Sequence, residues 1–246
     1  MLRRALRTIH ADKRWWHAIG LGGLCSLTLF GHPLAAGLVV EHMDNTRKGY
    51  ASPLPPFYDW TTRWLMGLFA VLVDFVYFVM PLMLMGLLFF CGGLTMLMAR
   101  SDEGQFGILG IIGGALIAWW LFVFLTGVSA VGRLVYVDDG GPERALTSFP
   151  LREALRPHAR RYYAKARIHS LPLYIAPLVF AALVPLVLRL DSGWGVTGAL
   201  ILIWLVFSSL VYAHIGTMLI YGEVNQGLQD SEHARPLLGN ERPTER

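Results

Sequence analysis

The amino-acid sequence predicts an all-α fold: a polytopic transmembrane helical bundle with about four full spans, a broken or re-entrant first hydrophobic unit, and amphipathic helices at the membrane interface. Of the 246 residues, 54% are hydrophobic and only 15% are charged, whereas a soluble domain has about 25% charged residues. A helix of roughly 20 apolar residues crosses the hydrocarbon core of a bilayer. The apolar runs that approach or exceed this length are residues 15–40, 64–98, 106–136, 170–188 and 196–221.

The first hydrophobic unit, residues 15–50, is predicted to be broken. A basic segment, residues 1–14, precedes it and is expected to lie on the cytoplasmic surface as a weakly amphipathic element, with Trp15 and Trp16 at the interface. No small-residue cleavage pattern follows, so we expect the unit to be retained. Pro33 falls near the middle of the unit and removes a helix hydrogen bond, and the apolar residues after it are too few to span.

The next segments are a polar loop and an overlong apolar run. Residues 41–63 hold three prolines and several aromatic residues, so regular helix is excluded there and a loop lying against the headgroups is expected. Residues 64–98 would extend about 50 Å as one helix. Pro81 lies at the middle of this run, which therefore either kinks there or folds as a tight hairpin. No polar turn residue stands near Pro81, and this favours the kinked helix.

The third run and the segment after it predict two different kinds of helix. Glycines at spacings of three and four residues begin the span of residues 106–136, and they would let another helix approach closely. Residues 150–169 are rich in arginine and predict a basic interfacial helix, broken at Pro157.

The predicted domain organisation is a single transmembrane domain, residues 1–222, followed by a tail. Two spans, residues 170–188 and 196–221, close the domain. The tail, residues 223–246, is polar and contains proline, and it is expected to be loosely ordered.

Basic residues set the expected orientation. Arginine and lysine crowd residues 3–14 and recur in residues 144–167, and the side of a membrane rich in them is the cytoplasmic one. An even number of crossings must separate the two clusters, yet three apolar units lie between them. Either the first unit is re-entrant, which Pro33 favours, or residues 64–98 cross twice. Both alternatives place the two termini in the cytoplasm of a multi-pass cell-membrane protein. A cysteine at Ser52 that labels only from outside would contradict the re-entrant alternative.

The net charge of +4 indicates contact with lipid rather than nucleic acid. Basic clusters beside membrane spans attract the anionic headgroups of the cytoplasmic leaflet. The expected partners are therefore the bilayer, its anionic headgroups and other membrane-protein subunits. The residues predicted to contact anionic lipid are Arg156, Arg160, Arg161, Lys165 and Arg167.

Three polar residues inside apolar runs are candidates for a functional role: Asp74, His214 and His32. A carboxylate at mid-membrane costs about 2.5–3.5 kcal/mol, so Asp74 must have a partner or be protonated. It is either a proton or cation site, an interhelical hydrogen-bonding group, or a residue near the interface. His214 could ligate haem or chlorophyll, relay a proton, or bond a neighbour. His32 stands beside the proline break.

Catalytic motifs are not found in the sequence. It has no nucleophile elbow, no phosphate-binding loop and no zinc-protease motif, so we do not expect an enzyme. Cys25 and Cys91 lie within apolar runs and are interpreted as small packing residues. Their number and spacing predict no metal site, and no cofactor is predicted beyond the haem or chlorophyll alternative at His214.

Several fragments of the chain share one family pattern. The most specific is a proline–aromatic–acid–tryptophan stretch, residues 54–60, which holds Pro55, Pro56, Asp59 and Trp60. The other fragments are Trp15-Trp16, the break at residues 31–33, Gly49 with Tyr50, Gly67, Tyr77 with Pro81, and residues 213–216 with Tyr221. In these fragments the chain resembles domain of unknown function 4013, an uncharacterised prokaryotic integral membrane family.

This resemblance implies a multi-span membrane fold and supplies no activity. Two positions depart from the pattern: Thr217 stands where the family has a glutamine, and Asp74 is unusual for the family.

Three functions are compatible with the sequence. The first is a non-catalytic structural or accessory subunit of a larger membrane assembly, because aromatic-rich spans and small extramembrane parts accompany the lack of catalytic residues. The second is a small-molecule or ion transporter with a site near the broken first unit and Asp74. The third is a haem- or chlorophyll-binding membrane protein that uses His214.

Overall fold

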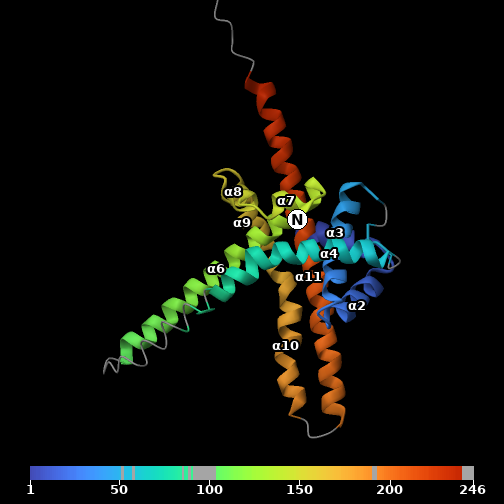
Figure 1. Ribbon diagram of the computed structural model, residues 1–246, viewed down its shortest axis with the longest axis vertical. Coiled ribbons are helices and arrows are strands. Elements are labelled where there is room, and N and C mark those ends of the chain that lie inside the picture. The colour runs from blue at the N-terminus through green and yellow to red at the C-terminus, as the bar shows by residue number, and fades with distance from the viewer. Residues whose placement is uncertain are drawn as a thin grey trace, which may run out of the picture. The chain divides into compact units, whose positions relative to one another are not determined.

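The computed structural model describes residues 1–50, 53–56, 59–84, 86–87, 90, 104–189 and 193–239. Every regular element in these ranges is a helix (Figure 1), which confirms the all-α prediction. Three helical stretches of the described residues are long and apolar enough to cross a membrane: Trp60–Leu84, Ala159–Leu188 and Gly193–Ser231. Some of the residues with sequence-based expectations lie outside the described ranges, and those expectations stay predictions. They are Ser52, Phe57, Tyr58, Cys91 and most of the second half of residues 64–98.

The chain divides into two compact units. The first unit holds Met1–Ala70 and Leu155–Arg246, and the second holds Val71–Ala154. The first boundary between them falls inside helix α4, Trp60–Asp74.

The first unit begins with helix α1, Leu2–Ala11, which is more strongly amphipathic than we expected. Ala5 and Ile9 are buried on one side of it, while Arg3, Arg4 and Arg7 are exposed on the other. The buried side packs against α11. The amphipathicity is therefore stronger than predicted, because alanine and isoleucine four residues apart give this helix a narrow apolar stripe. Its place on the cytoplasmic surface stays a prediction.

The first hydrophobic unit is broken, as predicted, at residues 27–31, directly before the helix that contains Pro33. Helix α2, Trp15–Ser26, and helix α3, His32–Arg47, are separated by a turn in which the Gly31 N–H donates to Thr28 Oγ1 at 3.0 Å. Pro33 lies in the first turn of α3, where backbone N–H groups have no acceptor within the helix, so the missing N–H of proline removes no hydrogen bond. At 1.5 Å per residue, α2 and α3 are about 18 and 24 Å long, so neither spans about 30 Å of hydrocarbon. Re-entry into the membrane stays a prediction.

Residues 41–63, for which regular helix was excluded, are helical at both ends. Helix α3 continues to Arg47, and α4 begins at Trp60. The prolines that motivated the exclusion lie only at positions 53–56, between the two helices. The polar residues before them continue α3, because they also present His42 and Met43 to the interior of the unit.

Glycines let the helices of the first unit approach at van der Waals distance. A Cβ at Gly67 in α4 would overlap the carbonyl oxygen of Pro33, and a Cβ at Gly37 in α3 would lie 2.8 Å from Arg63 Cγ. In the same way, a Cβ at Gly23 in α2 would lie 2.7 Å from Ser208 Cα in α11. Small residues at such crossings are typical of helix pairs in membranes.

The basic helix and the span after it form one continuous helical stretch. Helix α9, Ala159–Ser170, passes through the 3₁₀ turn η2, Leu171–Tyr174, into α10, Ile175–Leu188. The break before α9 occurs at residues 156–158, next to Pro157 as predicted, after helix α8, Phe149–Leu155. The basic helix is therefore not a separate surface element, since η2 accommodates Pro172 without interrupting the helical course.

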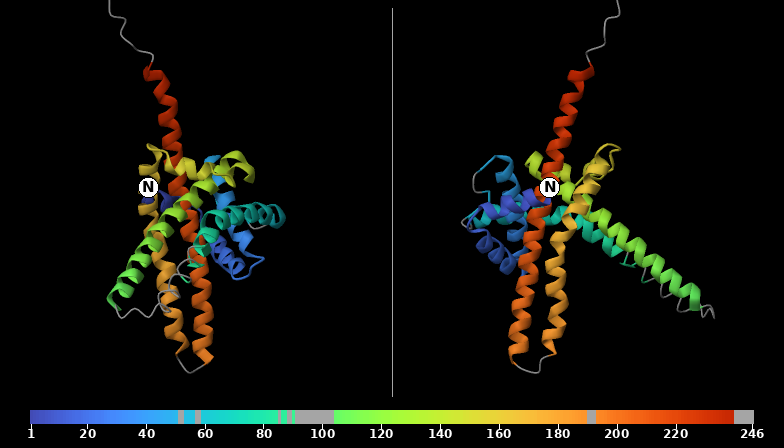
Figure 2. Two further views of the ribbon diagram at one scale, coloured as in Figure 1. Left: turned by 60° about the vertical axis from the view of Figure 1, so that its left-hand side comes forward. Right: turned by 180° about the vertical axis from the view of Figure 1, so that it is seen from behind.

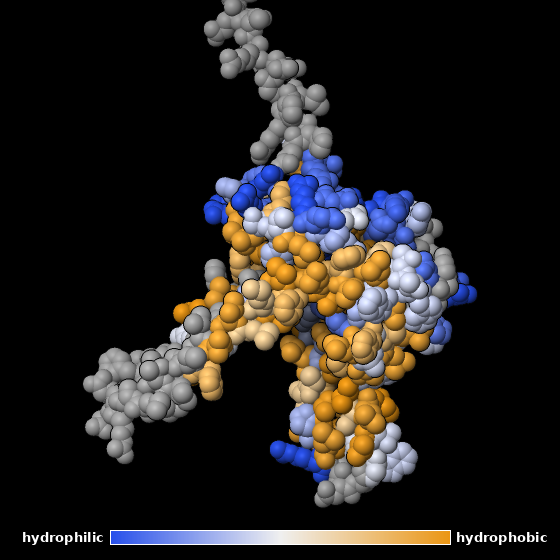
Figure 3. Space-filling view, in the orientation of Figure 1, coloured by the Kyte–Doolittle hydropathy of each residue, from blue (hydrophilic) through white to orange (hydrophobic). Residues whose placement is uncertain are grey.

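Helices α10 and α11, Gly193–Gly239, run side by side and antiparallel (Figures 1 and 2). Hydrophobic side chains cover α10 and the adjacent part of α11, whereas hydrophilic side chains gather at the end of α11 near α9 (Figure 3). Helix α11 continues through residues 223–239, so the expectation of a loosely ordered tail is wrong for this part. Val224 and Leu228 are buried there, and their burial stabilises the extension.

The second unit contains the end of α4, the π-helical turn η1, Phe75–Val79, and helix α6, Gly104–Asp139, which packs against η1. Two short helices follow, α7, Pro142–Ala145, and α8. The irregularity predicted at Pro81 occurs one turn earlier. In η1 the Met80 N–H donates to the Phe75 carbonyl, five residues back, which widens the helix just before the proline ring would crowd the preceding turn.

Candidate functional site

Asp74, the costliest polar residue predicted inside an apolar run, forms an ion pair with Arg133 in the second unit. Arg133 Nε donates to Asp74 Oδ1 at 2.8 Å, and a second guanidinium nitrogen pairs with Oδ2. Ser129 Oγ also donates to Oδ1. The planar guanidinium matches a carboxylate through two parallel bonds. This geometry supports the interhelical bonding alternative for Asp74 over a proton or cation site.

Sequence reasoning missed Arg133, although a signal was present. Arg133 is a lone arginine inside the predicted span of residues 106–136, and a charge there is the expected partner for a carboxylate in another span. Gly132 lets the two helices approach, since a Cβ there would lie 2.8 Å from Val73 Cγ1. The hydroxyl of Tyr77 donates to the Thr147 carbonyl nearby. The Gly132 contact holds α6 against the end of α4, and the Tyr77 bond ties η1 to the segment after α7.

The two candidate histidines have different surroundings in the first unit. His214 in α11 is half-buried, and its ring meets Tyr174 edge-on with 6.0 Å between centroids. His32 is exposed at the start of α3. Within the described residues, no group of three histidine, cysteine or acidic side chains is placed to hold a metal ion. Haem or chlorophyll at His214 stays a prediction.

The family-like loop contributes capping and packing rather than a cluster of reactive groups. Asp59 caps α4, because its Oδ1 accepts from the Thr62 N–H at 3.3 Å. Pro55 is buried, and the Pro56 carbonyl accepts from Arg63. Gly49 has φ +74°, a conformation that favours glycine. Tyr50 and Trp60 are exposed.

Arg63 is the central polar residue of the first helical turns of α4, and sequence reasoning missed it as well. It is 2% exposed. Its Nε donates to Glu41 Oε2 of α3 at 2.8 Å, and one terminal nitrogen donates to the Pro56 carbonyl at 2.7 Å. The ion pair therefore ties α3, α4 and the loop between them together.

His42, one residue after Glu41, is buried without a hydrogen bond to either ring nitrogen. It lies beyond the apolar run of the first unit. Burial lowers the pKa of His42 to about 4. The Pro53 carbonyl and the Asp12 charge raise this pKa, but their effects are smaller than that of burial. The imidazole is therefore neutral at pH 7 and behaves as a packing residue.

The residues predicted to contact anionic lipid fall into two groups. Four of them, Arg156, Arg160, Arg161 and Lys165, are exposed at and after the start of α9. Arg167 is buried, so it does not share the exposed surface of the other four, and its contact with anionic lipid stays a prediction. The burial follows from helical periodicity: positions 159, 163, 166, 167 and 170 form the side of α9 that packs against α11.

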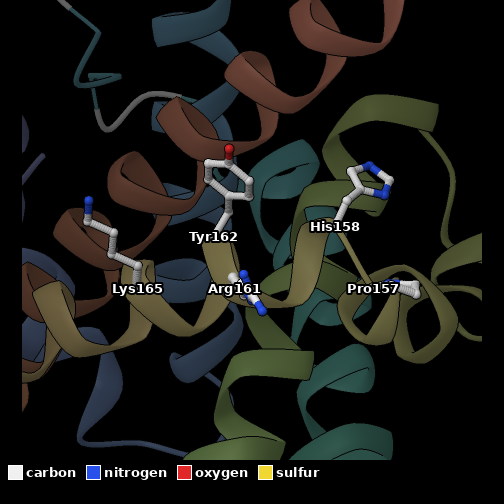
Figure 4. Close-up of a pocket in the computed structure, with 5 residues that line it drawn as sticks. All are labelled: Pro157, His158, Arg161, Tyr162 and Lys165. Carbon is white, nitrogen blue, oxygen red and sulfur yellow. The ribbon is translucent and has the colours of Figure 1, made fainter.

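A shallow pocket of about 350 Å³ lies on the exposed side of α9 (Figure 4). Its lining follows helical spacing, with His158, Arg161, Tyr162 and Lys165 on one face and Pro157 at the end. In Figure 4 the ring of Tyr162 stands between the basic side chains of Lys165 and His158. Such a surface attracts anionic headgroups electrostatically.

The helices and buried polar pairs define a helical protein of the membrane-spanning type. The chain belongs to the family described as protein of unknown function (DUF4013), whose pattern matches residues 21–186. The resemblance seen in the sequence is thereby confirmed. No curated protein and no solved structure matches the chain.

The matched residues cover most of the broken first unit, the loop, α4, α6 and α9. They include Asp59, Arg63, Asp74 and Arg133. The fragments at Trp15-Trp16 and at residues 213–216 lie outside the match, so the part of the resemblance placed on His214 stays a prediction.

Proposed function

We propose that this chain is a non-catalytic accessory subunit of a larger membrane assembly. The observation that carries the proposal is how little of each candidate span is buried within the chain. Each candidate span contains an apolar segment of 18 residues. The buried share of that segment is 22% in Trp60–Leu84, 11% in Ala159–Leu188 and 22% in Gly193–Ser231. A protein that enclosed a substrate path between its own spans would bury more of their inward faces.

An open glycine supports a protein partner in addition to lipid. A Cβ at Gly113 in α6 would meet no atom within 4 Å. Glycine in a helix costs roughly 0.5–1 kcal/mol relative to alanine, and the described residues place no atom in the space that Gly113 leaves. Small residues on a helix face allow a second helix to approach closely, so the arrangement favours a neighbouring subunit at this face.

The buried polar groups also support a non-catalytic role. The carboxylate of Asp74 accepts hydrogen bonds from Arg133 and Ser129. Glu41 is paired with Arg63, and Asp59 caps a helix. Each of these acids has a structural partner, which reduces the support for the transporter alternative based on Asp74.

Co-purification tests the proposal most directly. The full chain, tagged and extracted from its native membrane in a gentle detergent, is expected to retain other membrane proteins at fixed stoichiometry. Gly113→Leu should release them while leaving the fold intact, whereas Ile111→Leu, a volume-conserving change at an exposed neighbour, should not. A lone monodisperse species from wild-type membranes would overturn the proposal.

A further inference from the structure

Arg167 is a buried cation for which the described residues provide no counter-ion. Its side chain is 6% exposed, and its Nε is buried without a hydrogen-bond acceptor. Across the part of the chain that the structure describes, no carboxylate pairs with it. An arginine side chain keeps its proton inside a protein. A buried charge without a partner is strongly unfavourable, so this position needs a physical explanation.

The groups around Arg167 are aromatic rings and hydroxyls from η2 and α11. The guanidinium carbon lies 5.4 Å from the centroid of the Tyr174 ring. Tyr221 in α11 is within electrostatic reach of the guanidinium, is fully buried, and has a hydroxyl without a hydrogen-bond partner. Arg167 Nε and the Tyr221 hydroxyl are therefore two buried donors that lack an acceptor among the described residues.

Other hydroxyls of the cluster are already occupied. Ser170 Oγ donates to the Arg167 carbonyl at 2.8 Å, and Thr217 Oγ1 donates to the Tyr174 hydroxyl at 3.4 Å. Tyr163 stacks on Tyr221 and donates to Asn225 at 3.1 Å. These contacts hold the rings in place and leave the donors of Arg167 and Tyr221 available.

The position of Arg167 along the helix matches the level of lipid phosphates. On its N-terminal side, α9 exposes Arg160, Arg161 and Lys165. On its C-terminal side, Ile168 and Ile175 are exposed, and the apolar span α10 begins. A helix that changes from basic to apolar at one level places that level at the boundary between headgroups and hydrocarbon.

We propose that Arg167 and Tyr221 form a specific binding site for one phosphate group. The phosphate comes either from the headgroup of an anionic lipid or from free inorganic phosphate. Arginine binds phosphate through two parallel charge-assisted hydrogen bonds, and the Tyr221 hydroxyl donates a third. Because only a small part of the Arg167 side chain is exposed, entry of the phosphate requires a side-chain rearrangement where α9 meets α11.

Thermal unfolding of the full chain in an uncharged detergent tests this site. Phosphatidylglycerol, phosphatidylcholine and inorganic phosphate are titrated separately. We expect a saturable rise in Tm with phosphatidylglycerol. If inorganic phosphate produces the same saturable rise, the free anion is the ligand; if it does not, the lipid is. A site for one phosphate group is supported in both cases. The absence of a saturable rise with all three probes would overturn the proposal.

The variant Arg167→Met separates a ligand site from a packing role. It removes the charge and keeps an apolar side chain of similar length. We expect the response to phosphate to weaken by at least about tenfold in midpoint concentration, since a charge-assisted hydrogen bond accounts for that factor or more. Without ligand, its Tm should equal or exceed that of the wild type, because an uncompensated charge has been removed. An unchanged response to phosphate in this variant would contradict the proposal.

Three further variants complete the test. Arg189→Gln, at an exposed arginine directly after α10, should change the midpoint by less than about twofold, because a screened surface charge contributes little. A loss as large as that of Arg167→Met would show diffuse surface attraction and would overturn the proposal. Tyr221→Phe should weaken binding by a few-fold while retaining the ring contacts. If Arg167→Met does not fold, Arg167→Lys retains the charge and should still bind phosphate more weakly, because lysine cannot form the paired bonds.

Discussion

Arg133 and Arg167 are buried to nearly the same extent, at 8% and 6% exposed, but among the described residues a carboxylate pairs with Arg133 and none pairs with Arg167. Arg133 lies in an apolar run, and Asp74 and Ser129 satisfy it from within the second unit. Arg167 lies in a helix that is rich in exposed basic residues, and hydroxyls and rings of the first unit surround it. A buried arginine is therefore part of the fold where a carboxylate pairs with it, as at Arg133, and its donors can serve a ligand where they lack an acceptor, as proposed for Arg167.

The largest effect should follow removal of the acid from the paired arginine. Asp74→Ala leaves Arg133 as an unpaired buried charge, which costs about 3–5 kcal/mol of unfolding free energy. Denaturant titration of the purified protein measures this cost. The double variant Asp74→Leu with Arg133→Leu should recover most of the loss, since no charge is left buried. If Asp74→Ala is as stable as the wild type, the contrast between Arg133 and Arg167 disappears.

His42 is a further buried basic side chain, and it avoids the cost of an unpaired buried charge because it remains neutral. Its pKa is about 4 in the folded protein and about 6.5 when unfolded. Between these values the unfolded state binds a proton that the folded state does not, so stability falls as the pH drops from 6.5 to 4. The total loss is about 3 kcal/mol. Unfolding measured at a series of pH values tests this, and His42→Leu should flatten the profile. A profile that is equally steep in the variant would assign the effect to another group.

Removing the charge of Glu41 should have an effect of intermediate size, because its partner Arg63 keeps a second hydrogen-bond acceptor. Glu41→Gln removes the charge opposite Arg63, but the Pro56 carbonyl still accepts from the guanidinium at 2.7 Å. We expect a loss of about 1–3 kcal/mol, less than that of Asp74→Ala. Denaturant midpoints of the two variants, measured side by side, give the order. The reverse order would mean that the carbonyl does not compensate Arg63.

The smallest effect should come from the hydroxyl that assists the Asp74 pair. Ser129→Ala removes one donor to Asp74 and leaves both bonds from Arg133 in place. The expected loss is about 1 kcal/mol, measured by the same denaturant titration. A loss that equals the effect of Asp74→Ala would show that Ser129, and not Arg133, dominates the stabilisation of the carboxylate.

Sequence patterns predicted the helices well and their ends less well. The long apolar runs correspond to α4, α6, α10 and α11, because burial in lipid or protein requires continuous apolar length. Pro157 separates two helices as expected, since proline removes a hydrogen bond inside a helix. Pro33 and Pro172 do not, because a proline in the first turn of a helix removes no hydrogen bond that the helix needs. A proline by itself does not specify which of these positions it occupies.

The candidate residues show the same division between local and long-range information. The sequence identified Asp74 as a costly group in need of a partner, because its cost depends only on its apolar neighbours along the chain. Arg133 follows it by 59 positions, and their pairing depends on how α6 packs against η1. The glycine contacts that allow helices to approach, such as Gly67 with Pro33, likewise depend on which helix lies opposite.

The sequence by itself determined the membrane-type helical class, the family, the broken first unit and the cost of Asp74, because composition, run length and local charge need no knowledge of neighbours in space. Only the tertiary structure decided that Arg133 satisfies Asp74, that α11 orders the polar residues after position 222, and that Arg167 is buried beside Tyr221. Burial and pairing are properties of two surfaces that meet. A single helix presents its side chains at fixed angles, but the element packed against it decides which of them are exposed.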